Sequence, residues 1–64
     1  MKPFTSVAGA HKYAENSSRK HEAHRYVVYN GAFWFVQADD VVQDEESIEA
    51  HYYNGEKVET QAND

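Results

Sequence analysis

Two apolar runs rich in β-branched and aromatic residues, 26–29 and 32–38, flank the dipeptide Asn30-Gly31. Asn-Gly between such runs is the strongest short-range signal for a β-hairpin, because both central residues of a type I′ turn need positive φ. The pattern predicts a central antiparallel hairpin over about 24–37 with its turn at Asn30-Gly31. It places the chain in the α+β class.

The predicted hairpin is apolar on both faces. A two-residue turn pairs Val28 with Phe33, and side chains alternate between faces along each strand. One face then carries Val27, Tyr29, Ala32, Trp34 and Val36, and the other carries Tyr26, Val28, Phe33 and Phe35. A strand pair exposed on one side alternates apolar with polar residues, so we expect both faces to be covered. Terminal segments or a second chain would supply the second cover, and we expect a homodimer.

Helical patterns are predicted on both sides of the hairpin. A short N-terminal helix begins at a Thr5 or Ser6 cap and ends in the loop-forming run 16–18. A second, acidic helix is predicted over about 44–53, because carboxylates at a helix start complement the macrodipole. A short third strand is expected over about 56–61, where polar residues alternate with Val58 and Thr60.

A repeated tripeptide supports an alternative for the C-terminal half. Tyr-Asn-Gly occurs at residues 29–31 and again at residues 53–55. If the second Asn-Gly is also a hairpin turn, the flanking residues 48–53 and 56–60 are strands of a four-stranded meander. The run of Asp and Glu before residue 48 favours the helix, because acidic residues are depleted in strands.

The length of 64 residues fits a single small domain over 1–64, with flexible ends at 1–3 and 62–64. There is no cysteine, so no disulfide stabilises the fold. The first ten residues lack the apolar stretch of a signal peptide, and no run approaches the ~20 apolar residues of a membrane span. We expect a cytoplasmic protein with no membrane association.

Charge is divided unevenly along the chain, whose formal net charge is -5. Five of the six Lys and Arg residues lie before residue 37, whereas nine of the eleven Asp and Glu residues follow it. An acidic half repels phosphate backbones and attracts basic surfaces, mainly by speeding the encounter. We therefore expect a larger protein with a basic surface as the partner, such as a nucleic-acid-binding enzyme, and we expect direct nucleic-acid binding to be disfavoured.

The titratable residues show no catalytic or cofactor-binding motif. His21 and His24 would share a face and hold zinc only on a helix, and their spacing does not match the H-E-x-x-H pattern. They remain weak candidates for a metal-linked structural role, and we expect neither a metal site nor a cofactor. The paired carboxylates would need a desolvated cleft of at least ~300 Å³ for acid–base work, which so small a domain has little room to form. We expect no enzyme.

These patterns predict a non-enzymatic protein-binding modulator or inhibitor. Hairpin aromatics would anchor it, and a stripe of carboxylates would steer it. The predicted contact residues are Tyr26, Phe33, Phe35, Asp39, Asp40, Asp44, Glu45, Glu46 and Glu49. In size and charge the chain resembles the small inhibitors that phages and mobile elements direct at host enzymes. The alternative is a small nucleic-acid-binding domain that uses Arg19, Lys20 and Arg25 beside the hairpin aromatics.

Overall fold

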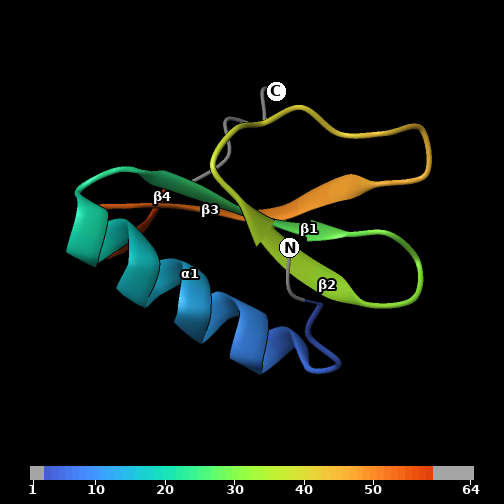
Figure 1. Ribbon diagram of the computed structural model, residues 1–64, viewed down its shortest axis with the longest axis horizontal. Coiled ribbons are helices and arrows are strands. Elements are labelled where there is room, and N and C mark those ends of the chain that lie inside the picture. Colours follow the sequence, from blue (N-terminus) through green and yellow to red (C-terminus); the bar gives the residue numbers. More distant parts are fainter. Residues whose placement is uncertain (1–2, 59–64) are drawn as a thin grey trace.

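The computed structural model describes residues 3–58 and shows one helix against one antiparallel sheet (Figure 1). Helix α1 spans Val7–His21, and strands β1 to β4 span His24–Tyr29, Trp34–Gln37, Ser47–Tyr53 and Glu56–Val58. The strands lie in the order β2-β1-β3-β4, and every neighbouring pair is antiparallel. The prediction of a small α+β domain with an N-terminal helix and a hairpin is confirmed.

Helix α1 begins where the sequence predicts and continues further. The Ser6 side chain caps it by accepting a hydrogen bond from the Gly9 amide at 3.3 Å. The predicted end at residues 16–18 is wrong, because the helix runs to His21 and Glu22 caps it with a φ of 50°. Ser18 is fully buried inside the helix, with its hydroxyl donating to the Glu15 carbonyl at 2.9 Å. An exposed serine hydroxyl can bond to nearby backbone groups in non-helical conformations, which disfavours a helix. The Ser18 hydroxyl is instead occupied by buried partners within the folded structure, so the helix continues past it.

The β1–β2 hairpin forms, but its register is shifted by two residues from the prediction. Val28 pairs with Phe35, and the connecting loop has four residues, 30–33. The Asn30 side chain accepts hydrogen bonds from the amides of Ala32 and Phe33 at 2.9 and 3.0 Å. Only Gly31 of the Asn-Gly pair has positive φ, whereas a type I′ turn needs both. The Asn30 side chain therefore organises a wider turn. A shift of two leaves the predicted division between faces unchanged.

The predicted acidic helix over 44–53 is wrong, and the second Asn-Gly is the tight hairpin turn. Residues 47–53 form β3, which pairs with β4 across Asn54 and Gly55. Both turn residues have positive φ, 52° and 83°, as the two-residue turn requires. β4 begins at Glu56 and ends at Val58, and the remainder of the predicted strand, 59–61, lies outside the described residues.

Strand β3 is stabilised by pairing with β1 rather than by local sequence preference. Ala50 lies opposite Val27, and both are buried. The sheet is not the simple meander of the alternative prediction, because β3 pairs with β1 and not with β2. The ladder shifts register between Val27 and Val28, which is a β-bulge. Tertiary pairing therefore overrides the depletion of acidic residues in strands.

The main core lies between α1 and the sheet. Its buried members are Ala10, Ala14, Val27, Ala50 and Tyr52, with Phe4, Trp34 and Val36 packed against them. The alanines on both sides allow the helix to approach the strands closely. Gly55 extends this contact at the end of the sheet, because its buried amide donates to the Ser18 hydroxyl at 2.9 Å. An added Cβ there would lie 2.6 Å from Nε of Arg19.

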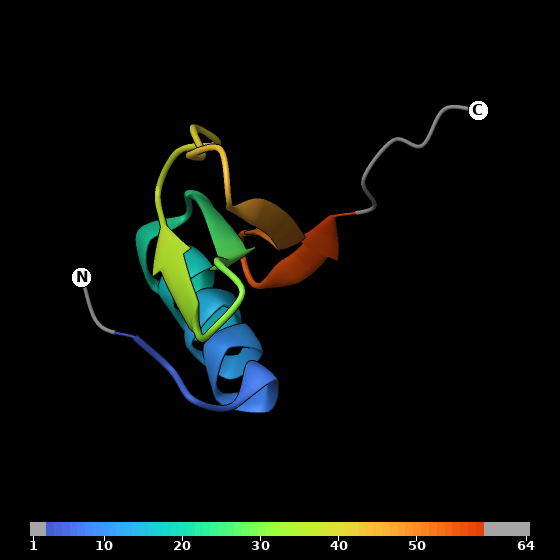
Figure 2. The same ribbon diagram turned by 90° about the vertical axis from the view of Figure 1, so that its right-hand side faces the viewer.

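The second face of the hairpin is also partly buried, as its apolar pattern predicts. Val28 and Phe35 point away from α1, yet they are 0% and 8% exposed. The loop of residues 38–46, which joins β2 to β3, lies on this side of the sheet (Figures 1 and 2). Within residues 3–58 no helix has the length and apolarity needed to cross a membrane. Of the predicted flexible ends, residues 1–2 and 62–64 lie outside the described part.

Candidate functional site

The loop of residues 38–46, called here the acidic loop, carries five of the predicted contact residues. Two of its carboxylates hold the loop in shape. Asp39 accepts a hydrogen bond from the Val41 amide at 3.1 Å, and Glu46 accepts one from the Gln43 amide at 2.9 Å. The Glu46 amide in turn donates to the Gln43 carbonyl at 3.0 Å, which closes a tight turn at the far end of the loop. The loop is therefore an ordered structure and not a loose connection.

The other carboxylates of the acidic loop point to water. Asp40, Asp44 and Glu45 are exposed, and none makes a hydrogen bond or ion pair within residues 3–58. The one ion pair among these residues is Arg19 with Glu15 on α1, at 3.2 Å. No Lys or Arg occurs between residues 37 and 56, so the negative charge here is not neutralised locally. These three carboxylates remain available to a positively charged partner.

Apolar side chains are exposed beside these carboxylates. Val41 is 68% exposed and Val42 is 36% exposed. Apolar side chains within a charged rim are typical of contact surfaces. The loop therefore combines negative charge with apolar side chains.

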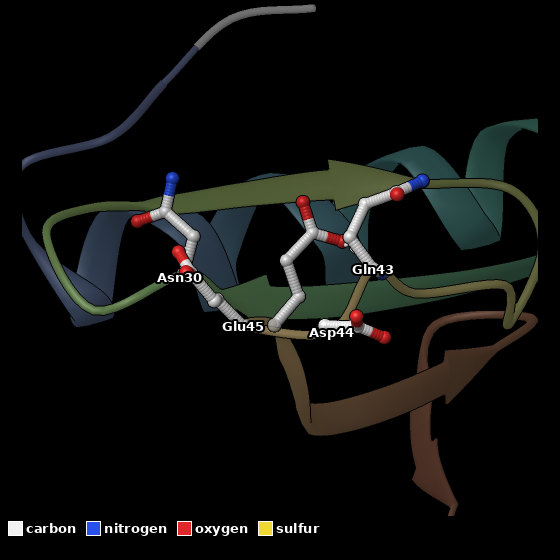
Figure 3. Close-up of a pocket in the computed structure, with 5 residues that line it drawn as sticks. Asn30, Gln43, Asp44 and Glu45 are labelled. Carbon is white, nitrogen blue, oxygen red and sulfur yellow. Dashed lines mark hydrogen bonds between the residues drawn. The ribbon is translucent and has the colours of Figure 1, made fainter.

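Two hollows adjoin each other next to the acidic loop and share Asn30 as a lining residue. The first, of about 370 Å³, is lined by Asn30 from the β1–β2 loop and by Gln43, Asp44, Glu45 and Glu46 from the acidic loop (Figure 3). The second, of about 330 Å³, is lined mainly by apolar side chains: Pro3, Asn30, Phe33 and Phe35.

The first hollow, of about 370 Å³, exceeds the ~300 Å³ for which so small a domain is predicted to have little room. Its carboxylates Asp44 and Glu45 are nevertheless exposed, which is not the desolvated setting that acid–base catalysis needs. The hollow therefore gives no support to catalysis and offers a polar recess beside an apolar one.

The remaining predicted contact residues are spread along this side of the sheet. Phe33 is half-buried and Phe35 is buried, with their ring centroids 6.4 Å apart. Tyr26 is half-buried and stacks on His51 rather than on the phenylalanines. Glu49 is exposed on β3, within the stretch where the ladder to β1 shifts register. The structure thus places Phe33 and Phe35 in a hollow that shares Asn30 with the hollow of the acidic loop, and it places Tyr26 in another cluster.

The basic residues of the alternative prediction are not beside these aromatics. Arg19 pairs with Glu15 on α1, and Nε of Arg25 donates to the Ser17 hydroxyl of the same helix at 3.0 Å. Arg25 lies opposite Tyr52 on the face that α1 covers, whereas Tyr26 and Phe35 point to the other face. Lys20 is exposed on α1. The arrangement does not form the basic groove lined with aromatic rings that single strands require.

A second feature, which the sequence did not predict, is a cluster of four rings on the side of the sheet away from α1. His24 and Tyr26 of β1 lie opposite Tyr53 and His51 of β3. The Tyr26 and His51 rings stack with centroids 4.2 Å apart, and those of His24 and Tyr53 are 4.4 Å apart. Nδ1 of His24 lies 2.8 Å from Nε2 of His51, within hydrogen-bonding distance. We call these four residues the ring cluster.

The sequence did contain a signal for this cluster. His-x-Tyr occurs at residues 24–26 and again at 51–53. On a strand, residues two apart point to the same face, so both motifs present a His and a Tyr together. The signal needs β3 to be a strand, and the predicted acidic helix hid it. The pair considered instead, His21 and His24, is split between the end of α1 and the start of β1.

Two side chains near the sheet have shifted acidities. Burial lowers the pKa of His51 below its usual 6.5, the neighbouring His24 lowers it further, and Asp40 of the acidic loop opposes the shift. Burial raises the pKa of Tyr52 above its usual 10.0, and Glu15 adds to the rise. Tyr52 lies on the α1 side, where its hydroxyl is 2.6 Å from Nδ1 of His11. The lowered pKa of His51 favours its neutral form at pH 7.

Comparisons with protein-family models, with curated proteins and with solved structures find no match to this chain. Function must therefore be argued from the acidic loop, the adjoining hollows and the ring cluster.

Proposed function

We propose that this protein is a non-enzymatic binding module whose acidic loop docks on the basic surface of a larger protein and modulates it. One observation carries the proposal. The acidic loop exposes the carboxylates of Asp40, Asp44 and Glu45 together with the side chain of Val41. Exposed apolar side chains beside unpaired carboxylates suit a contact surface.

The two kinds of side chain would act at different stages of binding. Unpaired carboxylates steer a basic partner into the encounter and raise the association rate. Val41 and the apolar hollow lined by Phe33 and Phe35 then supply area that leaves water on contact. Asp39 and Glu46 act indirectly, because their hydrogen bonds fix the loop before the partner arrives.

Inhibition follows if the partner's basic surface is itself a binding groove. A row of carboxylates presents the same sign of charge as a phosphate backbone. A nucleic-acid-binding enzyme would therefore be a suitable target. A homodimer stays a separate prediction, to be settled by sedimentation of the purified chain.

The test is capture of partners from a lysate of cells that encode the protein, with the chain immobilised. The loop variant is Asp44→Asn with Glu45→Gln, which removes two charges. The matched control, Glu22→Gln with Glu56→Gln, removes two charges from exposed sites outside the loop. Circular dichroism checks that both variants fold.

We expect a specific partner that the wild type and the control retain at about 0.1 M salt and that the loop variant loses. Raising the salt to about 1 M should weaken capture, because the screening length falls to about 3 Å. Failure to retain any specific partner, or equal retention by the loop variant and the control, would reject the proposal.

A further inference from the structure

The two imidazoles of the ring cluster meet edge to edge on the sheet surface. Nδ1 of His24 and Nε2 of His51 lie 2.8 Å apart, although the residues are 27 positions apart in the sequence. Each ring packs against a tyrosine of the neighbouring strand, at 4.4 and 4.2 Å. The tyrosines therefore keep both imidazoles together on this face of the sheet. His24 is exposed, so the pair is open to solutes.

This spacing is close to what a metal ion imposes on two nitrogen ligands. Metal–imidazole bonds of about 2.05 Å at an angle of about 90° separate the two nitrogens by about 2.9 Å. A tetrahedral ion opens that separation to about 3.3 Å. The observed 2.8 Å thus suits the right-angled positions of a tetragonal ion. In the hydrogen-bonded pair the lone pair of one nitrogen faces the proton of the other, so metal binding requires each ring to turn about its Cβ–Cγ bond.

We propose that His24 and His51 form a two-ligand site for a divalent transition metal with tetragonal geometry, such as Cu²⁺ or Ni²⁺. Water molecules complete the coordination. Binding needs no net loss of a proton, because each neutral imidazole has one unprotonated nitrogen. The ring that donates the hydrogen bond shifts its proton to its other nitrogen, and both facing nitrogens are then ligands.

The surroundings favour a cation at this point. Asp40 of the acidic loop contributes a negative charge that acts on His51. Arg25, the basic residue between the two ring-cluster members of β1, points to the opposite face. Among residues 3–58 no group of three or more His, Cys, Asp or Glu side chains is placed to hold a metal. The protein would therefore supply two ligands only. Nitrogen sites generally bind Cu²⁺ more tightly than Zn²⁺, and we expect the same order here.

The test uses the full chain without an affinity tag, at pH 7.5, and titrates it with CuCl₂, NiCl₂ and ZnCl₂ by calorimetry. His24→Gln and His51→Gln each remove one ligand from a site that is at least partly exposed. His21→Gln, which removes an exposed histidine at the end of α1, is the matched control. Proton NMR with substoichiometric Cu²⁺ shows which imidazole and tyrosine resonances broaden.

We expect one Cu²⁺ per chain, with either ligand variant weakening binding at least about tenfold, because a second ligand on the same surface acts at high effective concentration. The control should bind as the wild type does, and broadening should be strongest at His24, His51, Tyr26 and Tyr53. The proposal is overturned if the wild type binds no better than the His24 variant, or if His21→Gln weakens binding equally. Broadening centred on other histidines would also overturn it.

Discussion

Replacing Ser18 with alanine should destabilise the fold more than its small change in volume suggests. The Ser18 hydroxyl is fully buried and accepts a hydrogen bond from the Gly55 amide at 2.9 Å. Alanine leaves that buried amide without a partner, which costs about 1–3 kcal/mol. Alanine has a higher helix propensity than serine, which offsets about 0.5 kcal/mol of this cost. The net loss is about 0.5–2.5 kcal/mol, and the melting temperature of so small a domain should fall by about 2–20 °C.

The control is the same substitution one position earlier on the helix. The Ser17 hydroxyl accepts from Nε of Arg25 at 3.0 Å in a partly exposed setting, where water can replace it. Ser17→Ala should cost less than about 0.5 kcal/mol. Thermal unfolding followed by far-ultraviolet circular dichroism compares the three proteins. An Ser18→Ala variant as stable as the wild type, or no less stable than Ser17→Ala, would refute the role given to this contact.

Three further predictions follow from single contacts. Gly55→Ala should lower the free energy of unfolding, measured in urea, by about 2–4 kcal/mol, because Gly55 has positive φ and an added Cβ would overlap the Arg19 guanidinium. Gly31→Ala should lower it by only about 1 kcal/mol, because Gly31 has a φ of +100° but open space around it. Burial lowers the pKa of His51, so the contribution of neutral His51 to stability is complete above pH 6.5 and declines as the pH falls through the lowered pKa. The wild type should therefore melt at a lower temperature at pH 5.5 than at pH 7.5, and His51→Gln should make that difference smaller. Tyr52→Phe removes the hydrogen bond to His11 and should cost about 1 kcal/mol in the same urea assay, and an unchanged midpoint would contradict that.

The sequence predicted the elements whose causes are local. The cap at Ser6 depends on a hydroxyl followed by a helical run, and the first hairpin depends on two apolar runs around a turn. The predicted strand register was wrong because the Asn30 side chain bonds to two amides within the loop and widens the turn. The pattern of apolar and polar residues carries no information about these bonds. The end of α1 was wrong because burial of Ser18 depends on Gly55, far away in the sequence.

The C-terminal half depended on long-range pairing. Locally, the carboxylates before Ser47 favour a helix start, but Ala50 fills the position opposite Val27 in the sheet. The energy of that placement cannot be read from residues 44–53 alone. Once β3 is taken as a strand, the two His-x-Tyr motifs fall on one face. The acidic character of the candidate contact surface was predicted from composition, whereas its form as an ordered loop was not.

The central claim is that a partner contacts the acidic loop. Site-specific photo-crosslinking tests it most directly, with a photoreactive amino acid at Glu45 in one variant and at Glu56 on β4 in another. Both positions are exposed, but only Glu45 lies on the loop. We predict that irradiation in the lysate joins the Glu45 variant to a discrete partner and leaves the Glu56 variant unjoined. Equal crosslinking at both positions, or none at Glu45, would contradict the claim.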